Sequence, residues 1–285
     1  MTEMIKPLAL LALLSAASCA SNPTIEAKPP TTTAEAVPGG DDSAAESVSV
    51  FSHAAYDAVL SGYVNEFGMV DYKRLLENRT ALDDYVEQLA GSSPESEPGL
   101  FPSKEHEMAY WINAYNALMM RAVLDHYPID SVTEIKVAHG VFSRINYPVG
   151  GKRMTLDDIE KGVLLKDFDD PRVHWALTCA SLSCPRIDQK AFVADNLSER
   201  LDEEARKFLQ SSRAVVIDAS EGKVRVSKYF DWYGKDFGGD AIAYIKPFLA
   251  EAQTAELAKI AAPSVGFMDY DWRLNDQNKT WAASE

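Results

Sequence analysis

Thiol and imidazole side chains gather in one short segment of this 285-residue chain. Residues 172–185 contain two of its three cysteines, Cys179 and Cys184, and one of its five histidines, His174. A thiol beside an imidazole can act as a nucleophile at neutral pH, because the imidazole accepts the proton that the thiol must lose. The same two cysteines, five apart across a Ser-rich turn, could instead form a structural disulfide or simply lie buried.

Strand geometry predicts which cysteine can reach the imidazole. The apolar run 173–178 favours a buried strand, in which alternate side chains point to opposite faces. His174 and Cys179 would then face opposite ways, roughly 16 Å apart along the strand. The turn at 180–183 lets the chain fold back, so we predict Cys184 as the catalytic partner of His174. A disulfide between Cys179 and Cys184 is the alternative.

Three polar residues elsewhere in the chain are further candidates for the site. Glu160 lies on an expected helix, 156–164, and could orient the imidazole of His174 or belong to a solvated helix face. Asn113 and Asn116 lie inside a strongly apolar helix, where an amide is costly unless it is hydrogen-bonded. They could bind a substrate carbonyl or stabilise an oxyanion, or they could bridge to the backbone of a neighbouring loop.

Motifs for metal and cofactor binding are missing from the sequence. The histidines have neither HxxxH nor HxH spacing, and no CxxC or glycine-rich phosphate loop occurs. A zinc site made by His174, Cys179 and Cys184 is a weaker alternative, because the expected strand separates these side chains. We therefore predict no metal and no cofactor.

The first residues resemble a bacterial lipoprotein signal. Lys6 precedes an apolar stretch, 8–17, that is too short to span a bilayer, and small residues precede Cys19. The resemblance implies removal of residues 1–18, lipidation of Cys19 and, with Ala20 following it, sorting to the outer membrane facing the periplasm. Cleavage by an ordinary signal peptidase is the alternative.

Composition predicts a tether followed by one globular domain. Residues 19–50 are rich in Ser, Thr, Pro, Ala and acids, which is typical of a disordered spacer, and 51–285 read as a single domain. The formal net charge of −15 disfavours nucleic-acid binding and charge-driven adhesion to an anionic membrane. We expect membrane attachment through lipid only.

Hydrophobic periodicity indicates an α+β class, a helix-rich single domain around a small mixed or antiparallel sheet. The helix at 103–126 is apolar nearly all round, so we expect it to be buried. Further helices are expected at 53–67, 72–89, 156–164, 195–209, 228–233, 241–249 and 254–261. Expected strands are 173–178, a hairpin of 214–218 with 223–226, and 265–274.

Six segments spread over residues 53–275 resemble the domain of unknown function 547 (DUF547) family of bacterial exported proteins and plant proteins. They are Val70-Asp-Tyr, Trp111-Ile-Asn-Ala-Tyr-Asn-Ala-Leu, Leu156-Asp-Asp-Ile-Glu, Asp170 to Pro185, Asp236-Phe-Gly and Tyr270-Asp-Trp-Arg-Leu-Asn. The resemblance implies that the family's marked positions are Asn113, Asn116, Glu160, His174, Cys184 and Asp271.

A more distant resemblance is to the transglutaminase and papain-like superfamily. There a buried helix packs on a sheet, and one strand carries a histidine; 103–126 and 173–178 would have these places here. Those enzymes place the cysteine at the start of the core helix, and this helix has none. The resemblance implies that the nucleophile has moved to Cys184 or that catalysis is lost.

Together these patterns lead to one functional hypothesis and one alternative. The hypothesis is an exported thiol-dependent hydrolase or acyltransferase acting on a small peptide or amide. Cys184 attacks, His174 is the base, Glu160 orients it, and Asn113 or backbone amides stabilise the oxyanion. The alternative is a non-catalytic cell-envelope binding module held by a Cys179–Cys184 disulfide.

Overall fold

The computed structural model describes residues 49–136 and 140–281, which group into one compact unit. The expected signal peptide, Cys19 and almost all of the tether lie outside the described residues. Within the described ranges, none of the helices combines the length and the apolar character needed to cross a membrane.

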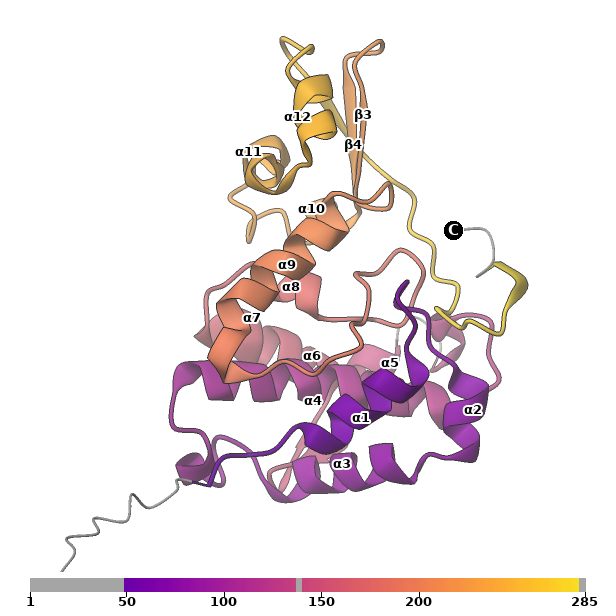
Figure 1. Ribbon diagram of the computed structural model, residues 1–285, viewed down its shortest axis with the longest axis vertical. Helices are drawn as coiled ribbons and strands as arrows, with labels where there is room; N and C mark the ends of the chain where they lie inside the picture. Colours follow the sequence, from indigo (N-terminus) through magenta and orange to yellow (C-terminus); the bar gives the residue numbers. More distant parts are fainter. Residues whose placement is uncertain (1–48, 137–139, 282–285) are drawn as a thin grey trace, which may run out of the picture. The chain divides into compact units, whose positions relative to one another are not determined.

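A helical layer surrounds the long buried helix α4 (Lys104–Leu124) (Figure 1). Helix α3 (Thr80–Gly91) packs against both α4 and α1 (Ala54–Tyr63), and α2 (Tyr72–Glu77) also contacts α4. Since α4 is buried around most of its circumference, its central side chains form the middle of the larger hydrophobic core. The prediction of a buried helix here is confirmed.

Glu160 lies at an irregular point of the next helical segment. Thr155 caps α6 (Leu156–Ile159) through its side chain, which bonds the N–H of Asp158 at 3.1 Å. The helix then widens into a π-turn, Glu160–Leu164, before α7 (Leu165–Asp167). Such π-turns are rare and occur often at functional sites. This segment packs on α4 and on α5 (Gly140–Ser143).

Two small sheets complete the fold. Strands β1 (Tyr147–Val149) and β2 (Lys152–Met154) form an antiparallel hairpin. In the second sheet, β3 (Val215–Asp218) and β4 (Lys223–Val226) are antiparallel, and β5 (Ser264–Phe267) joins β4 in parallel. The α+β class and the predicted hairpin are confirmed.

In the sequence, the remaining helices come before β3 or between β4 and β5. A smaller hydrophobic core centred on Trp175 joins this sheet to its neighbouring helices. These helices are α8 (Val173–Ala176), α9 (Leu197–Leu209), α10 (Tyr229–Trp232), α11 (Ala241–Ile245) and α12 (Glu251–Leu257). The core therefore reaches from the sheet to the segment that carries His174.

Three expected elements differ from the structure. Residues 173–178 are not a strand: α8 is one helical turn, and the chain is extended only from Leu177 onward. The turn forms because Asp170 and Pro171 offer their carbonyls to the N–H groups of Val173 and His174. The expected helix 72–89 breaks at Asn78, and the expected strand 265–274 ends at Phe267.

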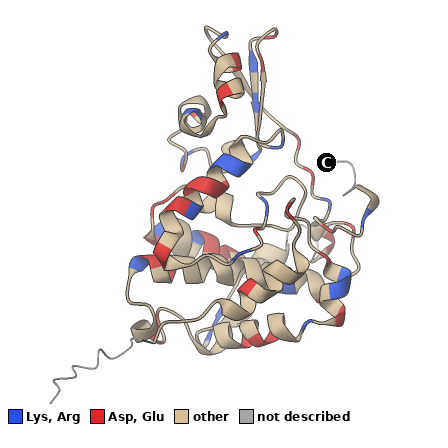
Figure 2. Cartoon of the chain, viewed as in Figure 1, with Lys and Arg blue, Asp and Glu red and all other residues tan. Residues whose placement is uncertain are grey.

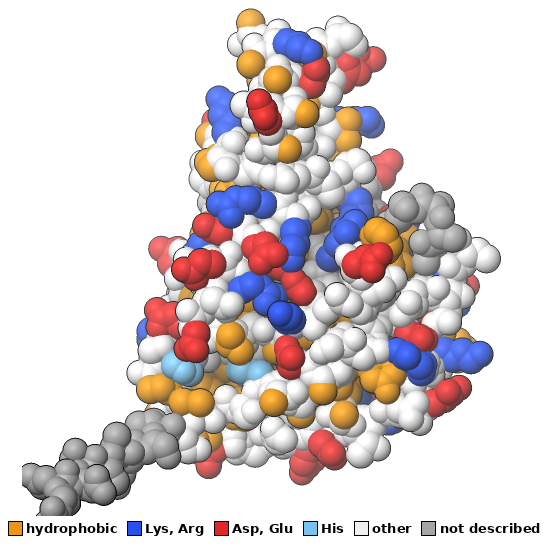
Figure 3. Space-filling model, in the orientation of Figure 1, with side chains coloured by type: hydrophobic (Ala, Val, Ile, Leu, Met, Phe, Trp, Pro, Cys, Tyr) orange, Lys and Arg blue, Asp and Glu red, His pale blue; other side chains and the backbone are white. Residues whose placement is uncertain are grey.

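Charged side chains of both signs cover the described surface. Acidic and basic residues alternate along α9 (Figure 2), and they form ion pairs such as Lys207–Glu203 at 2.9 Å. The face drawn in Figure 3 intersperses both signs rather than gathering one. This face therefore provides no focused electrostatic surface of one sign.

Candidate active site

One cavity of about 320 Å³ brings together the thiol, imidazole and carboxyl groups of the site. His174, Cys179 and Glu160 all line it, although they come from three separate segments of the chain. The other lining residues are Tyr115, Phe142, Ser143, Asp157, Lys161, Leu177, Tyr229, Trp232, Tyr233, Tyr270 and Trp272. A mostly aromatic cavity with a few convergent polar groups is the usual form of a small-molecule site.

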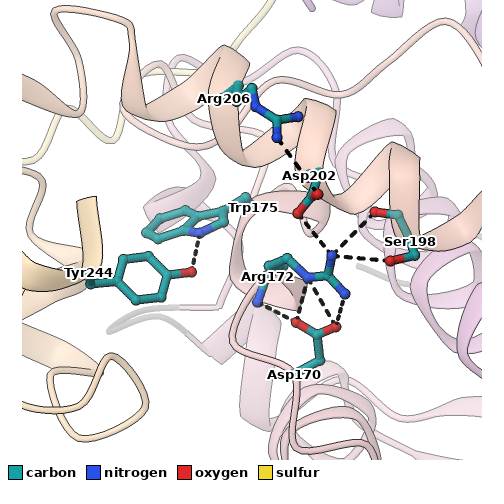
Figure 4. Close-up of polar contacts among 7 residues, drawn as sticks. All are labelled: Asp170, Arg172, Trp175, Ser198, Asp202, Arg206 and Tyr244. Atoms are coloured by element: carbon teal, nitrogen blue, oxygen red, sulfur yellow. Dashed lines mark hydrogen bonds and ion pairs between the residues drawn. The ribbon is translucent and has the colours of Figure 1, made fainter. Parts of the chain in front are cut away.

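The neighbours of His174 fix the helical turn that carries it (Figure 4). The guanidinium of Arg172 donates to Asp170 at 2.6 Å, and to Asp202 of α9 at 2.9 Å. The fully buried Trp175 donates its indole N–H to the Tyr244 hydroxyl at 2.9 Å. Because contacts on both sides restrain α8, the imidazole between them has little freedom to move.

The imidazole of His174 is held by a carboxylate that sequence reasoning did not select. Its Nε2 lies 2.9 Å from Oδ2 of Asp236, and its ring centre is 4.3 Å from that of Tyr233. Burial lowers the pKa of His174, and the hydrogen bond to Asp236 only partly opposes this, so the ring is neutral at neutral pH. An Nε2–H donated to Asp236 leaves Nδ1 free to accept a proton.

Both cysteines are free thiols, and they lie against each other. Sγ of Cys184 accepts the backbone N–H of Cys179 at 2.8 Å and lies 3.3 Å from the Tyr229 hydroxyl. Burial raises the pKa of Cys184, but hydrogen bonds from Cys179 and Tyr229 outweigh this and lower it to about 7. Burial, together with a hydrogen bond to Cys184, raises the pKa of Cys179. The pair therefore places its first negative charge on Cys184.

The two thiols differ in their access to the cavity. Cys179 lines the cavity, whereas Cys184 is 1% exposed and is not among the lining residues. Ala180 turns the chain between them with a φ of 59°, a left-handed conformation that costs roughly 1–2 kcal/mol for a non-glycine residue. This turn places Cys184 beneath Cys179, where the Cys184 sulfur accepts the backbone N–H of Cys179.

Two hydroxyl groups surround the sulfur of Cys179. Ser181 Oγ is 2.9 Å away and Tyr270 Oη is 3.1 Å away. Burial and the neighbouring cysteines raise the pKa of Tyr270, so its hydroxyl keeps its proton and can donate a hydrogen bond. Tyr270 lines the cavity as well, so a hydrogen-bond donor lies beside the Cys179 sulfur there.

Glu160 reaches the cavity, but it does not hold His174. It is 7% exposed, and Oε1 accepts a hydrogen bond of 2.8 Å from the Tyr233 hydroxyl. Burial raises the pKa of Glu160, which the bond from Tyr233 partly opposes. The expectation that Glu160 orients the imidazole is therefore corrected: Asp236 does so, and Tyr233 separates Glu160 from the ring.

Asn113 and Asn116 each form hydrogen bonds to the backbone of another segment. This is the bridging role that the sequence left open beside substrate binding. Asn113 donates to the carbonyl of Phe192 at 2.8 Å and accepts its N–H at 2.9 Å. Asn116 does the same between the Ala176 carbonyl and the Thr178 N–H, at 2.9 Å each. Neither lines the cavity that contains His174 and Cys179, so the structure does not bring these two amides to the candidate site.

The geometric argument for Cys184 fails for the same reason as the predicted strand. With α8 helical, strand alternation no longer separates His174 from Cys179, and both line one cavity. Among the hydrogen bonds of the described residues, none joins Cys184 to His174. Asp271, the last of the marked positions, pairs with Arg273 and donates its N–H to Ser183 Oγ at 2.9 Å. It thereby attaches the C-terminal segment to the cysteine turn.

Sequence reasoning missed Asp236 because its partner is 62 residues away. The available signal was the segment Asp236-Phe-Gly, which was part of the family resemblance but was assigned no role. As for metals, the described ranges contain no group of three or more His, Cys, Asp or Glu side chains placed to hold an ion.

Residues 101–209 match the model of a family described as "Protein of unknown function, DUF547". This part of the chain is therefore similar to DUF547. The match is shorter than the range of 53–275 that the sequence segments suggested, and it includes His174, Cys179, Cys184 and Glu160 but not Asp236. No curated protein and no solved structure matches the chain.

Proposed function

We propose that this protein is a thiol-dependent hydrolase or acyltransferase that acts on a small peptide or amide. The observation that carries the proposal is the presence of Cys179 and His174 in the lining of one cavity, with His174 Nε2 held by Asp236 at 2.9 Å. A nucleophile, a base and a group that orients the base are the three parts that such chemistry requires.

In the proposed reaction, the sulfur of Cys179 attacks the carbonyl carbon while Nδ1 of His174 accepts the thiol proton. Tyr270 donates a hydrogen bond to the oxyanion of the tetrahedral intermediate. The C–N bond then breaks, His174 returns the proton to the leaving amine, and a thioester remains on Cys179. Water completes a hydrolysis, and a second amine completes an acyl transfer, with His174 again as the base.

We assign the nucleophile to Cys179 rather than to Cys184 because only Cys179 is accessible from the cavity. The lower pKa of Cys184 does not argue against this, because the two thiols titrate as a pair. Nucleophilicity also rises with the pKa of a thiol, so the group that reacts need not be the one that ionises first.

The location of the protein is a separate part of the proposal. We infer an exported protein attached to the outer membrane through lipid on Cys19, facing the periplasm, from the apolar stretch 8–17 and the small residues before Cys19. Mass spectrometry of the protein purified from its native envelope tests this. A mature chain that begins at Cys19 with a diacylglyceryl adduct supports the proposal, and an unmodified chain cut elsewhere contradicts it.

Thiol reactivity tests the catalytic proposal. We expect one thiol of the native protein to react rapidly with iodoacetamide and with the activated ester p-nitrophenyl acetate. Peptide mapping should place both labels on Cys179, and Cys179→Ser should abolish them. Cys184→Ser is the matched control, because it removes the other thiol and keeps Cys179 in the cavity.

Two outcomes would contradict the proposal. If the rapid label moves to Cys184, or persists in Cys179→Ser, then Cys184 is the nucleophile. If the native protein has no reactive thiol and its cysteines are oxidised to a disulfide, the non-catalytic binding module becomes the better account.

A further inference from the structure

Aromatic rings form most of the wall of the cavity that contains Cys179. Tyr229 and Trp232 belong to α10, Tyr233 follows directly, and Tyr270 and Trp272 come from the C-terminal segment. The rings form a continuous group: the Trp232 and Tyr270 centres are 4.9 Å apart, and those of Tyr270 and Trp272 are 4.4 Å apart. Aromatic rings attract cations through the negative charge of their faces.

The charges of the cavity favour a cation as well. Lys161 pairs with Asp157 at 2.8 Å, so these two lining residues largely cancel. His174 is neutral, because burial lowers its pKa. Of the lining residues, Glu160 is then left as a carboxyl group that forms no ion pair with any basic side chain in the described ranges. The Tyr233 hydroxyl donates a hydrogen bond of 2.8 Å to Oε1 of Glu160.

The protonation of Glu160 depends on what enters the cavity. Burial raises its pKa, while the hydroxyls of Tyr233 and Tyr115 and the charge of Lys161 lower it. An arriving cation would favour the ionised form further, since an opposite charge within a few ångströms stabilises a carboxylate. The site is therefore suited to a ligand that brings a positive charge with it.

Other kinds of ligand fit the lining less well. An anionic ligand would lie against the carboxyl group of Glu160. The basic side chain next to Glu160, Lys161, is half exposed and already paired with Asp157. A neutral apolar ligand would exclude water from Glu160 without replacing its hydrogen bonds, which is unfavourable for a buried polar group.

We propose that the cavity binds an ammonium group of the substrate, held by Glu160 and by the rings of α10 and the C-terminal segment. The substrate class is then an amide or peptide with a positively charged side chain or amine close to the scissile bond. This inference rests on the proposed function, because it names the substrate for the same site. Glu160 and Trp232, on which it is tested, have no part in the proposed chemistry, so it can be tested without turnover.

Binding to a variant without the nucleophile provides that test. Full-length Cys179→Ser is titrated calorimetrically with three probes: Nα-acetyl-lysine amide, Nα-acetyl-norleucine amide and Nα-acetyl-glutamate amide. Norleucine keeps the unbranched aliphatic chain of lysine and lacks the ammonium group. We expect the lysine probe to bind about tenfold more tightly than the norleucine probe, which corresponds to one charge-assisted interaction.

Two further substitutions locate the ammonium group. Glu160→Gln should weaken binding of the lysine probe about tenfold and leave the affinity for the norleucine probe unchanged. Glu87→Gln is the matched control, because Glu87 is an exposed carboxylate on α3, away from the cavity lining. Trp232→Leu should weaken lysine binding by about threefold. Trp232 is 44% exposed, so this variant should fold even if Glu160→Gln does not.

The proposal is overturned if the lysine probe has no advantage, including the case in which none of the probes binds. It is also overturned if the glutamate probe binds most tightly, or if neither Glu160→Gln nor Trp232→Leu reduces lysine binding. These results differ from failure of the proposed function. Selective lysine binding without any acylation of Cys179 would refute catalysis alone, and acylation without charge selectivity would refute this inference alone.

Discussion

Replacing each buried asparagine of α4 by alanine separates a structural role from a catalytic one. Asn113 and Asn116 make the same two hydrogen bonds to backbone, and both are almost fully buried. Each substitution leaves one buried N–H and one buried carbonyl without a partner. At roughly 1–3 kcal/mol for each group, either variant should lose about 4 kcal/mol of unfolding free energy. For a domain of this size, that lowers Tm by about 10 °C.

The activities of the two variants should differ although their stabilities do not. Asn116 holds the backbone of Ala176 and Thr178, which lies between His174 and Cys179, whereas Asn113 holds Phe192, away from the cavity. A displacement of reacting groups by 1 Å costs about 100-fold in rate. We expect Asn116→Ala to acylate with p-nitrophenyl acetate about 100-fold more slowly, and Asn113→Ala to stay within about threefold of the wild type.

Denaturant titration and acylation kinetics at 15 °C, where both variants should be folded, check these expectations. The reasoning is refuted if Asn116→Ala keeps its stability to within about 1 kcal/mol while its KM rises, because an unstrained substrate-binding amide would behave in that way. Equal losses of activity in both variants would also refute it, since only Asn116 borders the segment between the base and the thiol.

Two other predictions concern carboxyl groups. Asp236→Ala and Asp236→Asn should each slow acylation of Cys179 by about 100-fold or more, the latter because its amide can donate to Nε2 of His174 and so favour the tautomer with the proton on Nδ1. Both substitutions remove a carboxylate that raises the pKa of His174, so the acidic limb of the rate profile should move to lower pH; an unmoved limb would exclude His174 as the base. Burial and a hydrogen bond with Asp188 raise the pKa of Glu204 to about 8, far above that of the unfolded chain. Between about pH 5 and 8 the unfolded state loses a proton that the folded state keeps, so stability falls as pH rises. Denaturation of Glu204→Gln should show a smaller fall over this range, and equal slopes for both proteins would show that Glu204 is ionised when folded.

The helices and the hairpin were predictable from the sequence because their signals are local. The apolar positions of α4, the cap at Thr155 and the Glu221-Gly222 turn all lie within a few residues of the structure that they determine. The secondary structure of residues 173–178 was not predictable in this way, because a short apolar run fits a strand and a buried helical turn equally well. Hydrogen bonds from Asp170 and Pro171 decide in favour of the turn.

The candidate site depends on contacts between distant parts of the chain, which spacing does not encode. His174 and Glu160, both selected from the sequence, line one cavity. Their partners, Asp236 and Tyr233, lie more than 60 residues from them in sequence. The choice of Cys184 over Cys179 depended on the expected strand, and the structure has a helical turn there instead.

The paired thiols determine how the proposed nucleophile, Cys179, would have to be activated. Cys179 alone would be a poor one, because burial raises its pKa and keeps it protonated. Cys184 adds to this effect, because its hydrogen bond and its charge raise the pKa of Cys179 further. The left-handed turn at Ala180 brings the two thiols together, since it places the second beneath the first. In the proposed reaction, activation of Cys179 therefore depends on His174 as the proton acceptor. If that chemistry is correct, Cys184→Ser should leave Cys179 reactive.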